Sequence, residues 1–191
     1  MNAKFIVILL AAMLSAAGVL TGCQSPKAVS LSGSSATRAT RNNCYSLLHQ
    51  LLAEEKDVSL LRFIKSERPD VKHLVKRIAT TSGTGAKLLE KFAKDDPSIR
   101  LDDLRLPSGE LGTREAIATT RQKELLSQAG DEFEVTLLLT QTEALSYASH
   151  LAKVAAANDP QPDHARALAG ISEDMANLYH EAFGLLLART K

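Results

Sequence analysis

Residues 70–93 read DVKHLVKRIATTSGTGAKLLEKFA, and they show a clear helical pattern. Apolar or small residues recur in it every three or four positions, which is the spacing of one face of an α-helix. Asp70 stands where a helix N-cap belongs. The centre, residues 80–85, is rich in Thr, Ser and Gly, so we expect either a kink there or a close crossing with another helix. The residues that form the apolar face are Val71, Leu74, Val75, Ile78, Ser82, Ala86, Leu89 and Ala93, with Phe92 beside them.

The same helical period recurs on both sides of this stretch. It predicts a helix over about 43–67, which ends before Pro69 because a residue that precedes proline disfavours the α conformation. Two more long helices are predicted over 131–157 and 163–189. Between the two pairs lie a long connection, residues 94–112, and a shorter helix over 113–129. This order predicts an all-α protein, a four-helix bundle with a long crossover and one extra short helix.

The composition gives no support to nucleic acid as a partner and favours a helical protein. The 191 residues carry a formal net charge of +1, so there is no electrostatic case for binding nucleic acid. The chain has no Trp and only 4% aromatic residues, which suits packed helices better than strands.

The N-terminal residues have the organisation of a secretory signal. Lys4 is followed by an apolar run over residues 5–17, which is shorter than the roughly 20 residues of a spanning helix. The run leads to Leu20-Thr21-Gly22-Cys23, which resembles the lipobox of bacterial lipoprotein signals. The resemblance implies cleavage after residue 22 and lipidation of Cys23, with two or three acyl chains that anchor the protein firmly.

This interpretation divides the chain into three parts. Residues 1–22 are the signal peptide, residues 23–42 are the lipidated Cys and a flexible tether rich in Ser, Thr and Ala, and residues 43–191 are the helical bundle domain. Gln24, where an Asp would favour retention in the inner membrane, favours the outer membrane. The predicted location is therefore the cell envelope, with the bundle facing the periplasm.

The second cysteine leaves two interpretations open. Cys44 is alone once Cys23 is lipidated, so it could form a disulfide with a partner protein. It also lies in step with Leu47, Leu48 and Leu51, as a small hydrophobic residue of a core helix would.

The chain from about Asn43 to Leu187 also resembles a bacterial exported family, called domain of unknown function 4142, which has a ferritin-like bundle. The resemblance implies a ferritin-like fold and an exported protein, but no assigned activity. It is carried by Leu51-Leu52-Ala53-Glu54-Glu55, Asp70-Val71-Lys72, Leu106-Pro107, the helix from Gln122 to Leu126, Gly130-Asp131-Glu132-Phe133 and His180.

Metal chemistry has little support in the sequence. A di-iron bundle needs Glu-x-x-His on two of its helices, and this motif does not occur. The candidate metal ligands are Glu55, Glu143 and His150, of which the last two are seven residues apart, or about 10 Å along a helix. Glu55 lies on an apolar face, where a carboxylate is costly unless it is partnered. We expect it to pair with an Arg or a hydroxyl, or to meet Thr140 or Tyr147.

No catalytic motif is present: there is no Gly-x-Ser-x-Gly, no phosphate-binding Gly-rich loop and no cysteine cluster. The sequence therefore predicts no enzyme, no catalytic residue and no cofactor. It predicts a lipid-anchored binding or structural module that contacts another envelope protein, through Leu60, Phe63 and Ile64 or through the 95–112 crossover. The alternatives are a carrier of a small molecule or metal near Glu55, and an enzyme with an unrecognised site. The oligomeric state stays open.

Overall fold

The computed structural model describes residues 33–59, 68–102 and 104–189. Within these residues the chain forms five helices and no strand. The helices are α1 (Gly33–Glu55), α2 (Pro69–Asp95), α3 (Ser108–Ser127), α4 (Gly130–Asn158) and α5 (Pro162–Arg189). The chain is thus all-α, as the sequence predicts.

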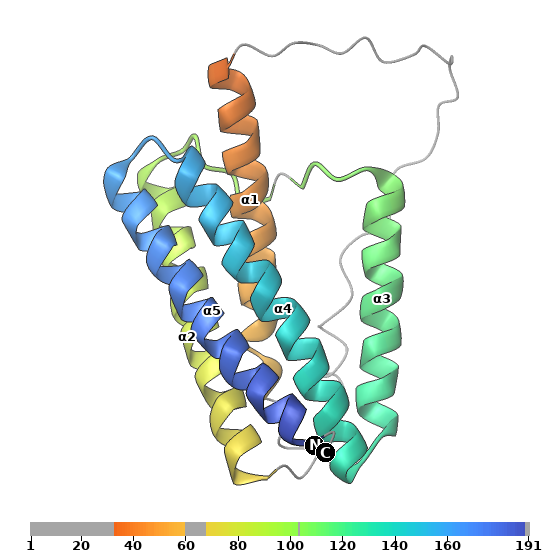
Figure 1. Cartoon of the computed structure of the whole chain (residues 1–191). Helices are drawn as coiled ribbons and strands as arrows, with labels where there is room; N and C mark the ends of the chain where they lie inside the picture. Colours follow the sequence, from red (N-terminus) through yellow and green to blue (C-terminus); the bar gives the residue numbers. More distant parts are fainter. Residues whose placement is uncertain (1–32, 60–67, 103, 190–191) are drawn as a thin grey trace, which may run out of the picture.

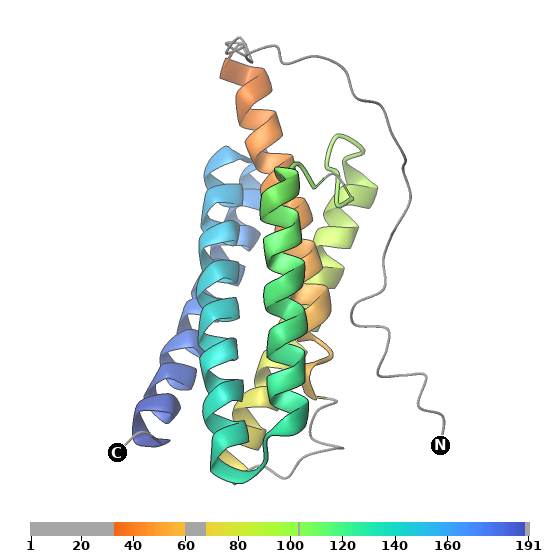
Figure 2. The same cartoon turned by 90° about the vertical axis from the view of Figure 1, so that its right-hand side faces the viewer.

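Four of the helices pack as a bundle, and α3 lies outside it (Figure 1). α1 contacts α2 and α4, and α5 contacts the same two helices, so that the four enclose one core. α3 packs on α4. Figures 1 and 2 show that α1, α3 and α5 run in one direction and α2 and α4 in the other. α3 therefore carries the chain back along the bundle, and the two helical hairpins, α1–α2 and α4–α5, are joined by this crossover.

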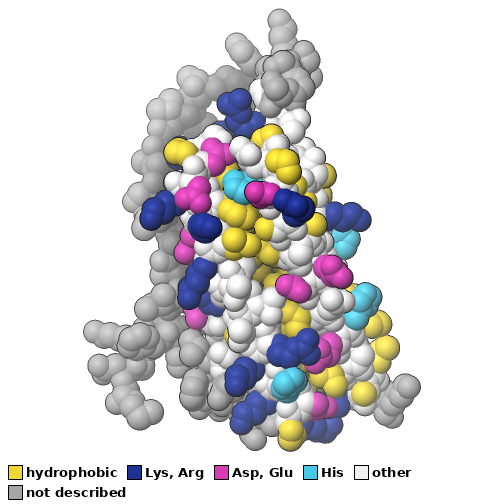
Figure 3. Space-filling view, turned by 90° about the vertical axis from the view of Figure 1, so that its left-hand side faces the viewer, with side chains coloured by type: hydrophobic (Ala, Val, Ile, Leu, Met, Phe, Trp, Pro, Cys, Tyr) yellow, Lys and Arg dark blue, Asp and Glu magenta, His cyan; other side chains and the backbone are white. Residues whose placement is uncertain are grey.

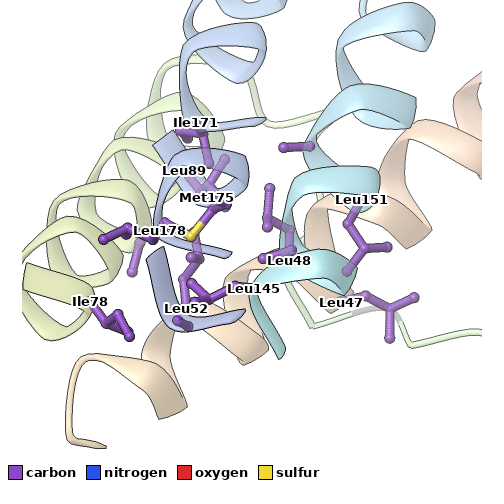
Figure 4. Close-up of a cluster of buried hydrophobic side chains, with 14 of the residues drawn as sticks. Leu47, Leu48, Leu52, Ile78, Leu89, Leu145, Leu151, Ile171, Met175 and Leu178 are labelled. Carbon is purple, nitrogen blue, oxygen red and sulfur yellow. The ribbon is translucent and has the colours of Figure 1, made fainter. Parts of the chain in front are cut away.

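The core is made by the apolar faces of these four helices. Leu48, Ile78, Leu145 and Met175, one from each helix, are all at most 1% exposed, and the close-up in Figure 4 shows their neighbours converging from all four sides. Burying one such side chain stabilises the fold by about 1.5–3 kcal/mol. The predicted faces of α2 and α5 are buried as expected, from Val71 to Phe92 and from Leu168 to Ala182.

The sequence-based prediction is wrong for both ends of α1. The helix begins at Gly33, so residues 33–42, which were assigned to the flexible tether, are helical. The buried side chain of Arg41 donates to the Ser98 carbonyl at 3.1 Å and lies 3.6 Å from Asp96, which ties the end of this extension to the segment after α2. α1 ends at Glu55, well before the predicted end at 67. The chain turns directly after Glu55, where the Asp57 N–H donates to the Glu54 carbonyl. Leu60, Phe63 and Ile64 lie outside the described residues.

Three smaller differences concern helix ends and faces. α2 starts at Pro69 with Arg68 at its N-cap, so Asp70 is not the cap. α3 covers Ser108–Ser127 where 113–129 was predicted, and Gly130 (φ 59°) makes the turn into α4. α4 buries a wider face than the predicted apolar stripe, because it packs against three helices. The sequence predicts that stripe as Phe133, Leu137, Thr140, Ala144, Tyr147, Ala148, Leu151, Val154 and Ala155, of which Val154 is exposed. The buried residues outside that stripe are Glu134, Leu138, Gln141, Thr142, Leu145 and Ala152.

The centre of α2 crosses α1 closely and stays helical throughout. A Cβ on Gly85 would lie only 2.9 Å from Cδ1 of Leu52. Of the two expectations for residues 80–85, the close crossing is therefore the one that is confirmed. None of the helices in the described part of the chain is long and apolar enough to span a membrane.

Candidate functional site

The last turn of α1 carries a carboxylate into the bundle. Glu55 follows Leu48 and Leu52 on one face of α1, and both leucines are fully buried. Glu55 as a residue is half-buried, but its Oε2 atom is shielded from solvent and has no hydrogen-bond partner among the described residues. Its position agrees with the prediction of a carboxylate on the apolar face.

Burial changes the acidity of Glu55. Desolvation raises the pKa of its carboxyl group to about 7, because the charged form loses its hydration inside the bundle. A hydrogen bond from Gln141 of α4 lowers this pKa, and the negative charge of neighbouring Glu54 raises it. Glu55 is thus a buried acid that titrates near neutral pH.

The expected partners of Glu55 are engaged elsewhere, so that part of the prediction is wrong. Thr140 Oγ1 donates to the Thr136 carbonyl at 2.8 Å. The Tyr147 hydroxyl accepts a hydrogen bond from Arg114 at 2.9 Å. Both hydroxyls thus bond to other groups, Thr140 to its own helix and Tyr147 to a side chain of α3.

Ser82 of α2 lies beside the last turn of α1. A Cβ on Gly83 would lie 3.6 Å from Cβ of Lys56. A Cβ on Gly85 would lie 2.9 Å from Cδ1 of Leu52, which is one turn before Lys56. These contacts place the fully buried Ser82 at the level of the bundle where α1 ends.

Three buried oxygens from three helices lack hydrogen-bond partners among the described residues: Oε2 of Glu55, Oγ of Ser82 and Oε1 of Gln141. Buried polar atoms are nearly always paired, so each unpaired one calls for an explanation. We call Glu55, Ser82 and Gln141 the interior polar site. Sequence analysis missed Gln141, although its place between Leu138 and Leu145 on a buried face was a usable signal.

The other two candidate metal ligands lie on the surface. Glu143 is exposed, and its Oε1 is 3.4 Å from Nη2 of Arg121 on α3. His150 is also exposed, with Nδ1 2.7 Å from the Ser146 carbonyl. The structure therefore does not bring the three candidates together. Nowhere in residues 33–59, 68–102 and 104–189 do three His, Cys, Asp or Glu side chains gather as a metal site.

Cys44 lies in the hydrophobic core at 7% exposure, and no disulfide is formed by it within the described residues. Burial raises the pKa of its thiol, which makes the thiol less reactive. This placement favours the interpretation as a small core residue. Cys23 lies outside the described residues.

A polar cluster that the sequence analysis missed joins the helices where α4 turns into α5. The hydroxyl of fully buried Tyr45 donates to Oδ2 of Asp159 at 2.7 Å. Nδ1 of His164 lies 3.7 Å from Oδ1 of Asp159, and the His164 ring stacks on Phe92 with centroids 4.0 Å apart. Burial and the bond to Asp159 raise the pKa of Tyr45. The cluster ties all four core helices together at this end.

A second missed cluster closes the opposite end. Glu134 is only 2% exposed, and its Oε2 lies 3.0 Å from Nε of Arg189. Arg189 also donates to Asp70 at 2.8 Å, which holds the pKa of that carboxyl below its usual range. Oε1 of Glu134 accepts from the Arg68 amide at the start of α2. Every carboxylate here has a cation, so the cluster is read as a structural clamp.

Known proteins offer no guide to this site. No family profile, no curated protein and no solved structure matches the chain.

Proposed function

We propose that this chain is a lipid-anchored helical module of the bacterial cell envelope, which binds another envelope component through α3 and catalyses no reaction itself. The observation that carries the proposal is the exposure of α3. Only Leu125 of its 20 residues is buried, whereas Leu111 and Ile117 are 41% and 53% exposed. A helix gains most of its stability from packing an apolar face, so a helix this exposed is suited to packing against a partner.

The exposed face of α3 offers a shaped surface. Thr113, Ala116, Ile117, Thr120 and Arg121 line an open hollow of about 330 Å³. These residues recur at helical spacing, on a side of α3 about a quarter turn from the one that carries Leu125. The hollow follows directly after the 95–112 crossover, which was one of the two surfaces predicted from the sequence; residues 113–121 themselves were not among those candidates.

Contacts with α4 fix α3 in position. Arg121 pairs with Glu143, and Arg114 both donates to the Tyr147 hydroxyl and lies over its ring, 4.9 Å from the centroid. These polar contacts hold the helix without covering its apolar residues. By comparison, the face formed by α2 and α5 carries charges of both signs scattered among small apolar groups (Figure 3).

The anchor supports the location. Gly33 lies ten residues after Cys23, so α1 begins at most about 35 Å from the lipidated sulfur. The N-terminal turns of α1 project beyond the other helices (Figures 1 and 2). An outer-membrane anchor at Cys23 would thus hold the bundle close to the membrane on its periplasmic side, with α3 running away from the lipid.

The helix order supports the ferritin-like interpretation. Two antiparallel hairpins joined by a crossover along the bundle are the arrangement of that fold. The resemblance to the exported family of unknown function is compatible with this arrangement. Neither the ferritin-like helix order nor the family resemblance implies an activity, so the proposed function rests on the surface of α3.

Site-specific cross-linking tests the proposal. A photoreactive amino acid at Thr113, beside the hollow, is introduced into the full-length chain in its own cells. We expect one discrete adduct, which Ile117→Asp abolishes because a charge then enters the apolar contact. Phe183→Asp is the matched control, since Phe183 is 41% exposed on α5, and it should leave the adduct unchanged.

Three results would contradict the proposal. The adduct could be absent, it could survive Ile117→Asp, or it could have twice the mass of the chain. The last result would identify the partner as a second copy rather than another envelope component.

A further inference from the structure

We propose that Glu55, Ser82 and Gln141 form a binding site for one hard cation, of the class of Mg²⁺, Mn²⁺ or Ca²⁺, in the interior of the bundle. This inference is independent of the surface of α3. It rests on the unpartnered oxygens and on the charge of the site.

The three side chains lie at one level of the bundle. The three residues come from α1, α2 and α4, each from the buried face of its helix. Gln141 bonds to Glu55, and the contacts of Gly83 and Gly85 with α1 set Ser82 at the same level. Three helices thus direct polar side chains toward one level of an otherwise apolar core.

The atoms of this site that lack partners among the described residues are all oxygens that can accept or offer lone pairs. Gln141 uses its amide N–H on the Glu55 carboxylate, so its Oε1 can only accept. Oε2 of ionised Glu55 can also only accept, and the Ser82 hydroxyl offers lone pairs to a ligand. Carboxylate, amide and hydroxyl oxygens are the ligands of Mg²⁺ and Ca²⁺, with water completing the coordination. The set has no imidazole or thiolate, which copper and zinc prefer.

Charge also favours a cation at this level of the bundle. An ionised carboxylate inside a protein is stable only when it is paired. Among the described residues, the side-chain charge that acts on Glu55 comes from Glu54 and is also negative. A cation would supply the positive charge that the described residues do not place beside this carboxylate.

Glu134 shows how the same chain treats a buried carboxylate that has only a structural role. It is more deeply buried than Glu55, and Arg189 lies 3.0 Å from one of its oxygens while a backbone amide donates to the other. Among the described residues, Glu55 has one amide partner and an unpaired oxygen. The difference between the two residues points to a ligand at Glu55.

Calorimetric titration of the full-length chain in detergent tests the site. The protein is first treated with a chelator and dialysed, and then titrated at pH 8 with MgCl₂, MnCl₂ and CaCl₂ separately. We expect saturable binding of one ion per chain for at least one of the three. Glu55→Gln should weaken it at least tenfold, because the only charged ligand is lost. Glu143→Gln removes an exposed carboxylate and should leave it unchanged.

A second measurement locates the ion. Mn²⁺ should broaden the amide NMR signals of residues 55, 82 and 141 before those of residues 143 and 150, and Ser82→Ala should weaken binding while circular dichroism stays that of the parent. The site is refuted if none of the three ions binds, if Glu55→Gln binds as the parent does, or if broadening centres on residue 143.

Discussion

Glu55 and Glu134 differ in what surrounds them. Both carry carboxylate oxygens inside the bundle, but Glu134 is paired with Arg189, whereas Oε2 of Glu55 has no partner among the described residues. A buried ion pair of this kind stabilises one arrangement of the helices that carry it. An unpaired buried carboxylate lowers the free energy of unfolding when it is charged. The cost at Glu55 should therefore depend on pH.

Glu55→Gln should stabilise the protein at alkaline pH in the presence of a chelator. The folded state raises the pKa of Glu55 from 4.5 to about 7, so folding favours its neutral form. The favourable contribution is complete below about pH 4.5 and is lost as the pH rises through 7. The variant does not suffer this loss, and its advantage in free energy of unfolding should grow from near zero at pH 4 to about 3 kcal/mol at pH 8.

Urea unfolding at several pH values measures this difference. Glu143→Gln serves as the control, because Glu143 is exposed and should show no such trend. An advantage of Glu55→Gln that is equal at pH 4 and pH 8 would show that Glu55 is not a desolvated acid.

Tyr45→Phe should lower the free energy of unfolding by about 1–3 kcal/mol, because it leaves the Asp159 carboxylate without its hydroxyl donor. Tyr179→Phe keeps the ring contacts with His180 and Phe183 and should change stability by less than about 0.5 kcal/mol. Thermal unfolding of the two variants provides the comparison. Equal effects would mean that the Tyr45–Asp159 hydrogen bond adds no measurable stability.

At the scale of the element, the glycines of α2 decide how close α1 can lie. Gly83→Ala should raise the free energy of unfolding by about 0.5–1 kcal/mol, because alanine favours a helix and its Cβ would make an ordinary 3.6 Å contact with Lys56. Gly85→Ala should lose this gain or destabilise, because its Cβ would lie 2.9 Å from the buried Leu52 methyl. Denaturant titrations of the two variants measure these changes. An equal gain in free energy of unfolding at both sites would disprove the close crossing of α1 and α2.

Helix positions were predictable from the sequence where an apolar period runs without interruption. The period predicted the bounds of α2, α4 and α5 to within a few residues, since α2 and α5 each bury one continuous stripe and α4 buries a wider face that includes part of its stripe. α1 was placed wrongly because its first ten residues are Gly, Ser, Thr, Ala, Arg and Asn with no apolar period. Among them Arg41 donates to the Ser98 carbonyl, a contact 57 residues away in sequence. Local patterns do not contain such a contact.

The candidate site was predictable only in part, for a similar reason. Glu55 stood out as a charge on an apolar face. Ser82 was recognised only as a small member of the α2 stripe, and Gln141 did not stand out at all. Their relation to Glu55 arises from the packing of three helices, so it becomes visible only in the folded molecule.

At the scale of the whole molecule, α3 should be the least stable of the five helices. It buries a single side chain and contacts α4, whereas α4 and α5 pack along their length. Amide hydrogen exchange followed by mass spectrometry should therefore show residues 108–127 exchanging by local opening, well before 130–189. Protection of α3 equal to that of α5 would mean that α3 is already part of the cooperative core. It would contradict the proposal that α3 is a separate helix whose exposed face binds a partner.

A helical module that is held at the cell envelope by lipid must carry that lipid on Cys23, so the mass of the mature chain is the decisive measurement. The protein is extracted from its own membranes and analysed intact and after digestion. We expect a chain that begins at Cys23 and carries the added mass of a diacylglyceryl group and an amide-linked acyl chain. A chain that retains Met1, or one with an unmodified Cys23 thiol, would contradict the claim.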